Sequence, residues 1–226
     1  MTRLFAVLCA ALAAAAVPDL EKARDSQDRP ALERVLSELS TAAQKSPDDP
    51  EAHYRLALAS SYLAEISLEV RDRNQARRVA ENGIRAAERA VALKAGVAEY
   101  HRVLGTLCGQ VIPANVLFAL SYGKRSQEAI AKAIELDPKS SKAYLARGVG
   151  NFYLPDAFGG GPAVALRDIE HAIELDQKSA EAYLWRGLAL RKLNRNAEAR
   201  QAFTKSLDLH PNRVWTKQQL DKTPVQ

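Results

Sequence analysis

Two matching stretches in the second half of the chain decide the fold, "AIELDPKSSKAYLARG" at 133–148 and "AIELDQKSAEAYLWRG" at 172–187. Twelve of the sixteen aligned residues are identical, and the copies begin 39 residues apart. Self-similarity at a fixed period of roughly 20–50 residues is typical of repeat architectures. The sequence therefore predicts an array of repeated units in which each unit packs against its neighbours.

The last copy shows the internal structure of the unit most plainly. The sequence "AEAYLWRGLALRKLNRNAEARQAFTKSLDLHPNR" at 180–213 has two apolar stretches with helical spacing, separated by a polar Asn-Arg-Asn turn. Gly187, Ala199 and Ser206 are small where two helices must approach closely. Pro211 ends the second helix, because proline cannot continue the hydrogen-bond ladder. This helix–turn–helix unit of 34 residues resembles the tetratricopeptide repeat.

The resemblance to tetratricopeptide repeats implies an all-α fold, a right-handed helix–turn–helix solenoid. We expect about four repeats, an N-terminal half repeat and a C-terminal capping helix. Each repeat would bury its apolar faces against its neighbours, so the array needs several copies and a polar cap. The predicted segments are an export signal (1–16), a degenerate half repeat (17–49), repeats at 50–97, 98–140, 141–179 and 180–213, and a capping helix with a tail (214–226).

The N-terminal stretch "MTRLFAVLCAALAAAAVPD" has the organisation of an export signal. Arg3 supplies a positive charge, residues 4–12 form an apolar core, and 14–16 is a run of alanines suited to cleavage. The apolar run is shorter than the roughly 20 residues that a spanning helix needs. We expect a bacterial protein that is periplasmic or secreted, with no membrane contact beyond the cleaved signal.

Charge and cysteine content narrow the functional classes. The net charge is +5, and residues 180–226 carry nine basic against four acidic residues. A basic end favours an anionic partner or simply improves solubility, and export argues against nucleic acid. Cleavage would remove Cys9 and leave Cys108 alone, so we expect no internal disulfide. We interpret Cys108 as a small core residue.

Enlarged turns distinguish three of the units from the 34-residue repeat. Two of them are "VIPANVLFALSYGK" at 111–124 and "LPDAFGGGP" at 154–162. The second resembles a turn in exported bacterial tetratricopeptide proteins, including the T-component of TRAP transporters. The layout from 100 to 172 resembles that of the regulator-of-microtubule-dynamics family. The T-component resemblance implies an alternative function, an accessory protein that binds a small molecule or lipid in a pocket roofed by these two turns. Whether Phe118, Tyr122 and Phe158 fold over the groove or away from it distinguishes the two functions.

The sequence contains no recognisable catalytic or metal-binding constellation. The four histidines fall in different repeats, and none belongs to a His-Glu-x-x-His motif. No Gly-x-Ser-x-Gly elbow occurs. The three glycines at 159–161 lack a Walker pattern, and we interpret them as a flexible turn. We expect a non-enzymatic protein with no cofactor, no catalytic residue and no bound metal.

The tetratricopeptide resemblance places the binding site on the first helices of successive repeats, which line a concave groove. The predicted groove is aromatic and aliphatic at its centre and basic at one end. It suits a protein or peptide segment with apolar anchors and an acidic end. The apolar residues of this set could instead pack against the neighbouring repeat without contacting a partner. The basic residues could instead be simply solvated. The predicted residues are Tyr54, Leu58, Tyr62, Arg102, Lys142, Val149, Phe152, Tyr153, Leu188, Arg191 and Lys192.

Overall fold

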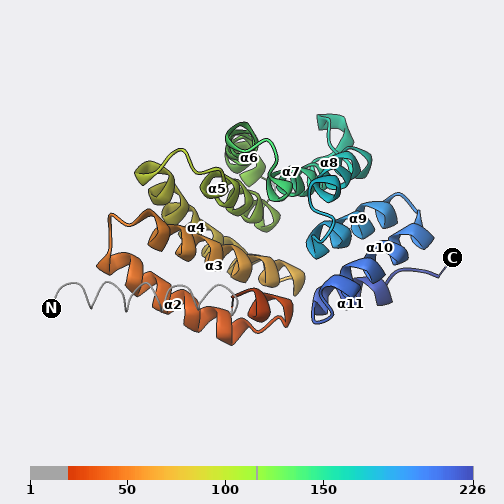
Figure 1. Ribbon diagram of the computed structural model, residues 1–226, viewed down its shortest axis with the longest axis horizontal. Helices are drawn as coiled ribbons and strands as arrows, with labels where there is room; N and C mark the ends of the chain where they lie inside the picture. The colour runs from red at the N-terminus through yellow and green to blue at the C-terminus, as the bar shows by residue number, and fades with distance from the viewer. Residues whose placement is uncertain (1–19, 116, 226) are drawn as a thin grey trace.

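The computed structural model describes residues 20–115 and 117–225, and within them every regular element is helical. The helices follow one another around an arch, and the last helix lies beside the first described segment (Figure 1). The predicted all-α solenoid of helix–turn–helix units is therefore confirmed. The predicted export signal lies outside the described residues.

The helices form successive antiparallel pairs. Residues 20–25 are helical and precede α2. The main helices are α2 (Arg29–Lys45), α3 (Pro50–Glu69), α4 (Arg73–Leu93), α5 (Ala98–Val111), α6 (Lys124–Leu136), α7 (Ser141–Tyr153), α8 (Pro162–Leu175), α9 (Ala180–Lys192), α10 (Asn196–Leu209) and α11 (Val214–Asp221). The turns hold short helical segments, η1 (Ile112–Ala114), η2 (Ala119–Gly123) and η3 (Asp156–Phe158).

Local sequence explains where several helices begin. The Asp49 side chain accepts a hydrogen bond from the Glu51 amide at 2.9 Å, and Pro50 occupies the first position of α3. The Ser179 hydroxyl accepts one from the Ala182 amide at 3.3 Å at the start of α9. Such caps satisfy backbone donors that have no partner inside the helix.

The glycines of the turn between α7 and α8 are each required by its geometry. Gly159 and Gly161 have φ values of 81° and 95°, which L-residues with a side chain rarely adopt. A Cβ on Gly160 would lie 2.3 Å from the Leu154 carbonyl oxygen. The Gly161 amide donates to the Asn151 carbonyl at 2.8 Å. This turn, expected to be flexible, is closely packed and hydrogen-bonded.

Small residues let the two helices of each repeat approach one another. A Cβ added to Gly187 in α9 would lie 2.5 Å from Phe203 in α10. Gly148 stands in the same relation to Ile169, at 2.8 Å. Real Cβ atoms do not approach this closely, so neither position has room for a larger residue.

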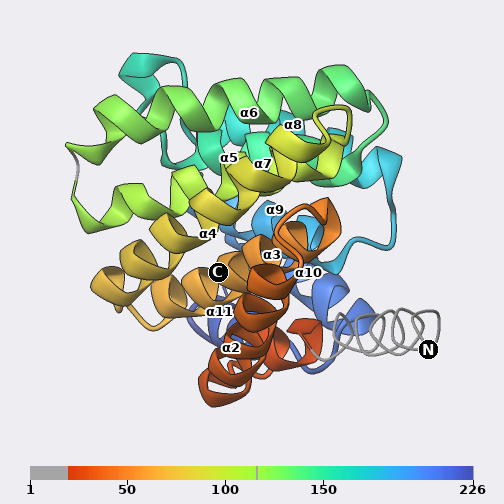
Figure 2. The same cartoon turned by 90° about the vertical axis from the view of Figure 1, so that its left-hand side faces the viewer.

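Two apolar cores divide the arch into lobes. The first core extends from Leu20 to Val111, and the second from Leu145 to Phe203. We call α2–α6 with residues 20–25 the N-lobe, and α7–α11 the C-lobe. Helices α5 and α6 of the N-lobe contact α7 of the C-lobe. Figure 2 shows the C-terminal helices behind α2 and α3, at the other end of the arch.

Candidate functional site

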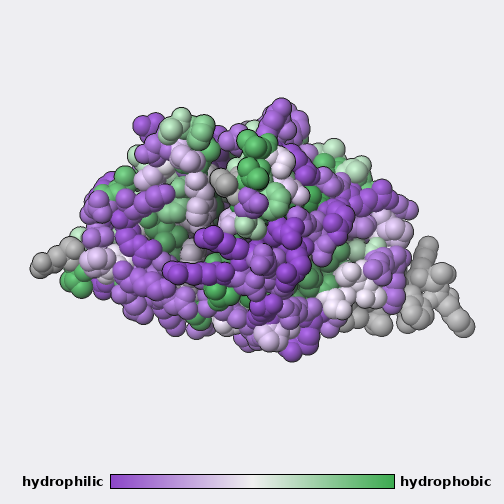
Figure 3. Space-filling view, turned by 180° about the vertical axis from the view of Figure 1, so that it is seen from behind, coloured by the Kyte–Doolittle hydropathy of each residue, from purple (hydrophilic) through white to green (hydrophobic). Residues whose placement is uncertain are grey.

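The first helices of the repeats line the inside of the arch. Helix α3 contacts α5, α5 contacts α7, and α7 contacts α9 (Figure 1). We call the side of these helices that is turned toward the centre of the arch the inner face. The face of the molecule seen from behind in Figure 3 is mainly hydrophilic, and its hydrophobic areas are separated from one another.

In the N-lobe the inner face carries a tightly bonded polar group. The Tyr54 hydroxyl donates to Glu99 at 3.3 Å, and the ring stacks on Tyr100 at 5.1 Å between centroids. Arg102 donates twice to the Glu99 carboxylate, at 2.7 and 2.6 Å. Burial disfavours ionisation of Glu99, but Arg102 outweighs this effect and lowers the pKa of the carboxyl. Lys142 is exposed nearby and contributes in the same direction.

In the C-lobe the inner face carries Phe152, Tyr153 and Trp185, and Trp215 of α11 packs against Trp185; we call these four residues the aromatic cluster. Phe152 and Tyr153 lie edge-on to Trp185, with centroids 5.7 and 5.9 Å from it, and Trp215 lies 5.7 Å beyond. The Trp185 indole donates to Glu181 at 3.1 Å. Tyr153 remains 63% exposed, although its neighbours restrict its ring. The cluster thus presents one accessible aromatic ring on a packed support.

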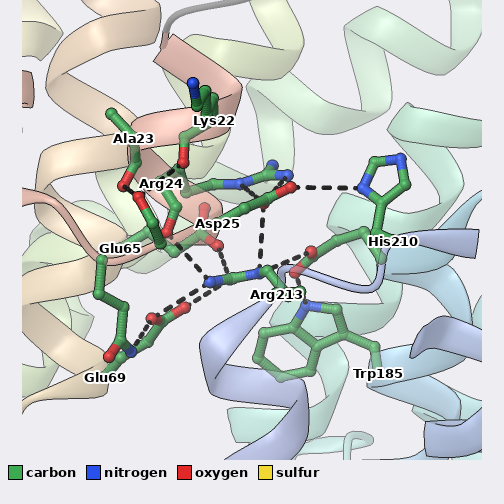
Figure 4. A network of polar contacts seen from close by, with 12 residues as sticks. Lys22, Ala23, Arg24, Asp25, Glu65, Glu69, Trp185, His210 and Arg213 are labelled. Atoms are coloured by element: carbon green, nitrogen blue, oxygen red, sulfur yellow. Dashed lines mark hydrogen bonds and ion pairs between the residues drawn. The ribbon is translucent and has the colours of Figure 1, made fainter.

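A buried charged cluster closes the arch, centred on Arg213 at the start of α11 (Figure 4). Its guanidinium lies 2.5 Å from Glu65 and 2.5 Å from Glu69, both on α3. Its Nε lies 3.7 Å from Asp25 and 3.6 Å from Glu181. The Arg213 side chain is 2% exposed. One residue thus joins the N-terminal segment, α3, α9 and α11, and we call the group the Arg213 cluster.

Further contacts complete the Arg213 cluster. Arg24 pairs with Asp25 at 2.7 Å, and its guanidinium lies 4.9 Å from the centre of the Tyr62 ring. Gln27 donates to Glu69 at 2.7 Å. His210 Nδ1 lies 3.4 Å from the Asp25 carboxylate. Tyr62, a predicted groove residue, is therefore partly covered by the N-terminal segment.

The Arg213 cluster holds more negative than positive charge. It contains the carboxylates of Asp25, Glu65, Glu69 and Glu181 against the guanidinium groups of Arg24 and Arg213. Burial, followed by the repulsion of Glu181, raises the pKa of Glu65 to about 8. Burial also raises the pKa of Glu69, against the opposing effect of Arg213. Two carboxyls of the cluster therefore resist ionisation in the closed arch.

Three of the predicted groove residues serve the packing of the fold. Leu58 and Leu188 are buried in the two apolar cores. Arg191 donates to the backbone oxygen of Gln219 at 3.1 Å, to its side-chain oxygen at 2.7 Å, and to the Thr223 hydroxyl at 3.2 Å. Arg191 therefore fastens the end of the chain to α9.

The other predicted residues divide between the lobes. Tyr54, Tyr62 and Arg102 lie in the polar part of the N-lobe and are half-buried. Val149 and Phe152 pack against the C-lobe core. The Lys192 ammonium lies 4.6 Å from the centre of the Phe152 ring and donates to the Phe152 carbonyl at 3.2 Å. Tyr153 and Lys192 are exposed, as is Lys142 at the start of α7, whereas Phe152 is half-buried.

The aromatic residues of the enlarged turns, whose positions bear on the ligand-pocket hypothesis, lie apart from the aromatic cluster. Phe118 and Tyr122 pack against the N-lobe core and edge-on to one another at 6.0 Å. Arg77, on the outer helix α4, lies 5.9 Å from the centre of the Phe118 ring. Phe158 is 76% exposed. Phe118 thus lies against α4, and Tyr122 packs against the N-lobe core beside Arg125 of α6.

Neither of two further pockets is lined by a residue of the aromatic cluster. The larger, of about 620 Å³, lies between residues 21–26 and 209–217. The smaller, of about 310 Å³, is bordered by Cys108, His101 and Arg125. Cys108 is fully buried, and burial raises the pKa of its thiol to about 11. The thiol is therefore a poor nucleophile at neutral pH.

Neither a metal-binding group nor a membrane-spanning helix occurs in the described part of the chain. Over residues 20–115 and 117–225 no group of three or more His, Cys, Asp or Glu side chains is arranged to hold a metal ion. In the same ranges no helix combines the length and the apolar character needed to cross a membrane.

Comparison with solved structures finds the same fold in several proteins. TTC0263, a thermophilic tetratricopeptide protein of Thermus thermophilus, is 18% identical, with a TM-score of 0.64 over 85% of this chain and 90% of that chain. The HusA haemophore from Porphyromonas gingivalis is 22% identical, with a TM-score of 0.55 over 72% of this chain and 81% of that chain. At these identities the likeness shows the fold alone.

Comparison with protein families is more specific. No curated protein sequence matches the chain. Residues 158–214, which include α8, α9 and α10, match a tetratricopeptide repeat family. Residues 18–154, more than half of the chain, match the family described as "Regulator of microtubule dynamics protein 1-3". The chain belongs to this regulator-of-microtubule-dynamics family, with a tetratricopeptide repeat following the matched region.

Proposed function

We propose that this protein is a non-catalytic adaptor that binds a segment of a partner protein on its inner face. Tetratricopeptide domains generally mediate protein–protein interaction, and families of this kind are typically non-catalytic. The observation that carries the proposal is the 63% exposure of Tyr153 within the aromatic cluster. Aromatic side chains held by their neighbours lose little entropy on binding and often anchor a partner.

The surroundings of Tyr153 suggest the chemistry of the bound segment. An apolar side chain of the partner would pack on the Tyr153 ring. Lys192, beside Phe152, offers positive charge to an acidic end, and Lys142, at the opposite end of α7 and near Glu99, offers it farther along the inner face. Arg191 takes no part in this proposal, because α11 already occupies its guanidinium.

We further propose that the adaptor acts outside the bacterial cytoplasm. The support is the N-terminal sequence, in which Arg3, the apolar run at 4–12 and the alanines at 14–16 are typical of an export signal. Sequencing the N-terminus of the protein from its native cells tests this. A first residue near Val17 is expected, and an intact Met1 in all of the cellular protein would contradict it.

Affinity capture with crosslinking from an extract of the source cells tests the adaptor function. The full-length protein is compared with Tyr153→Ala and with Lys192→Glu, which should each lose the captured partner. Phe158→Ala is the matched control, since Phe158 is an exposed aromatic residue on the outer turn η3. Retention by Y153A together with loss by F158A would move the interface to the enlarged turns.

The same experiment addresses the accessory function. If no protein is captured but native mass spectrometry finds a co-purifying small molecule or lipid, the adaptor proposal fails in favour of the alternative. Phe118 and Tyr122 would not form the roof of such a site, because both pack against the N-lobe core.

A further inference from the structure

The two lobes meet at two places of different character. On one side α6 and α5 pack against α7, and the chain itself continues from α6 to α7 through residues 137–140. At the other end of the arch the joining contacts are polar. They include the ion pairs of Arg213 with Glu65 and Glu69, and a hydrogen bond of 3.4 Å from Gln218 to Gln27.

Burying the charged groups of the polar junction costs free energy. Buried ions lose their hydration, and their mutual attraction compensates only where charges are balanced and well placed. Here four carboxyl groups share two guanidinium groups, and two of the four, Glu65 and Glu69, resist ionisation. Opening the junction would return these groups to water without exposing either apolar core, because each core lies within one lobe. The junction is therefore easier to separate than either lobe is to unfold.

We propose that the Arg213 cluster is a clasp that holds the arch closed, and that its release lets the lobes move apart about the α6–α7 junction. Tyr153 and Trp185 belong to the C-lobe, whereas Glu65 and Tyr62 belong to the N-lobe. Movement of the lobes therefore widens the inner face between them. A ligand that prefers one width of the inner face shifts the balance between closed and open forms.

A change of pH can shift the equilibrium between the closed and open forms of the arch experimentally. Glu65 is surrounded by charged and titratable groups from every segment packed around it. These are Arg24 and Asp25 of the N-terminal segment, Tyr62 and Glu69 of its own helix, Tyr153 of α7, Glu181 of α9, and Arg213 before α11, with His210 beyond Asp25. The balance of these groups raises the pKa of Glu65 to about 8, with burial as the largest cause and Glu181 the next.

The direction of the pH effect follows from this balance. When the arch opens, Glu65 is solvated and its pKa returns toward the ordinary value of 4.5. The closed form therefore binds a proton more tightly than the open form, and rising pH favours opening. Between pH 6 and pH 9 the ratio of open to closed forms should rise by up to about 100-fold.

Distance measurement between spin labels tests the clasp in the full-length protein. Labels are placed at Val70→Cys, 57% exposed at the end of α3, and at Asp221→Cys, exposed at the end of α11. Cys9 and Cys108 are replaced by alanine. We expect one short distance at pH 6 and an added longer distance at pH 9.

Three variants give the proposal its decisive outcomes. Glu65→Gln, which cannot ionise, should keep the short distance at pH 9, and Arg213→Gln should show the longer distance at both pH values. Arg147→Gln is the control, because Arg147 forms a partly exposed ion pair with Asp168 at 2.6 Å inside the C-lobe. It should behave as the unmodified protein does.

An unchanged distance from pH 6 to pH 9 in the unmodified protein would overturn the clasp. So would a pH response that is undiminished in E65Q, because Glu69 can supply only part of it. If circular dichroism shows that R213Q does not fold, the comparison of E65Q with the unmodified protein still decides. No partner is present in this experiment, so failure of the adaptor proposal leaves its result intact.

Discussion

Two contacts in the molecule each bury a large side chain almost completely, but in different surroundings. One joins α9 to α10, and the other joins the two ends of the arch. Phe203 of α10 packs against Gly187 of α9, in a core of apolar side chains. Arg213 is buried among carboxylates from three other segments. The first contact gains from removing apolar surface from water, whereas the second must repay the dehydration of ions.

This difference distinguishes the apolar contacts within the repeats, which are hard to separate, from the polar contact between the ends of the arch, which separates more easily. Contacts of the first kind recur in successive repeats, as the matching positions of Gly148 and Ile169 show. The Arg213 cluster occurs once among the described residues. Its stability depends on the balance between its buried carboxyl and guanidinium charges. Stability should therefore reside in the repeats, whereas the shape of the arch depends on the cluster.

The largest expected effect is that of breaking an apolar core. Phe203→Ala removes a fully buried aromatic ring from the C-lobe and should lower the free energy of unfolding by about 3–5 kcal/mol. Urea denaturation followed by circular dichroism measures it. A loss below that of Arg213→Ala would reverse the ranking of the two kinds of contact.

Removal of the central cation should cost less. Arg213→Ala leaves the carboxylates of Glu65 and Glu69 without their main partner, and we expect a loss of about 1–3 kcal/mol in the free energy of unfolding. The loss is limited because the arch can open and hydrate both groups. Arg147→Ala, at a partly exposed ion pair, should change stability by about 0–1 kcal/mol. A loss for R213A as large as that for F203A would make the cluster part of the rigid frame.

The smallest effects come from two glycines that differ in their surroundings. Gly187→Ala places a methyl group against Phe203 and should destabilise the protein by about 1–2 kcal/mol. Gly150→Ala, in α7, has open space around its Cβ and should stabilise the protein by about 0.5–1 kcal/mol, because alanine favours a helix. Thermal unfolding distinguishes the two, and equal shifts would show that close approach at Gly187 is not required.

Much of the fold could be predicted because its determinants are local and repeated. The small residues at Gly187, Ala199 and Ser206 mark where helices approach, and all three are packed within the C-lobe as expected. Helix starts follow from short signals such as Asp49-Pro50. Each of these signals acts over a few residues, so the sequence contains it in full.

The candidate site was less predictable. Leu58, Leu188 and Arg191 lie on the expected helices, but they contact the cores or α11. Which side of a helix faces its neighbours depends on the angle at which helices cross, and a helical stripe does not specify that angle. Trp185 and Trp215 come together from different helices, and neither stood out as part of the predicted groove.

By itself the sequence determined that this chain is a helical array, where most helices begin, and which small residues separate them. Tertiary structure alone decided that the array curves until its ends meet at Arg213. That residue is separated by 144 positions from Glu69 and by 148 from Glu65. A periodic pattern describes the contact of each repeat with the next, but the contact between first and last arises from the summed rotation of all of them.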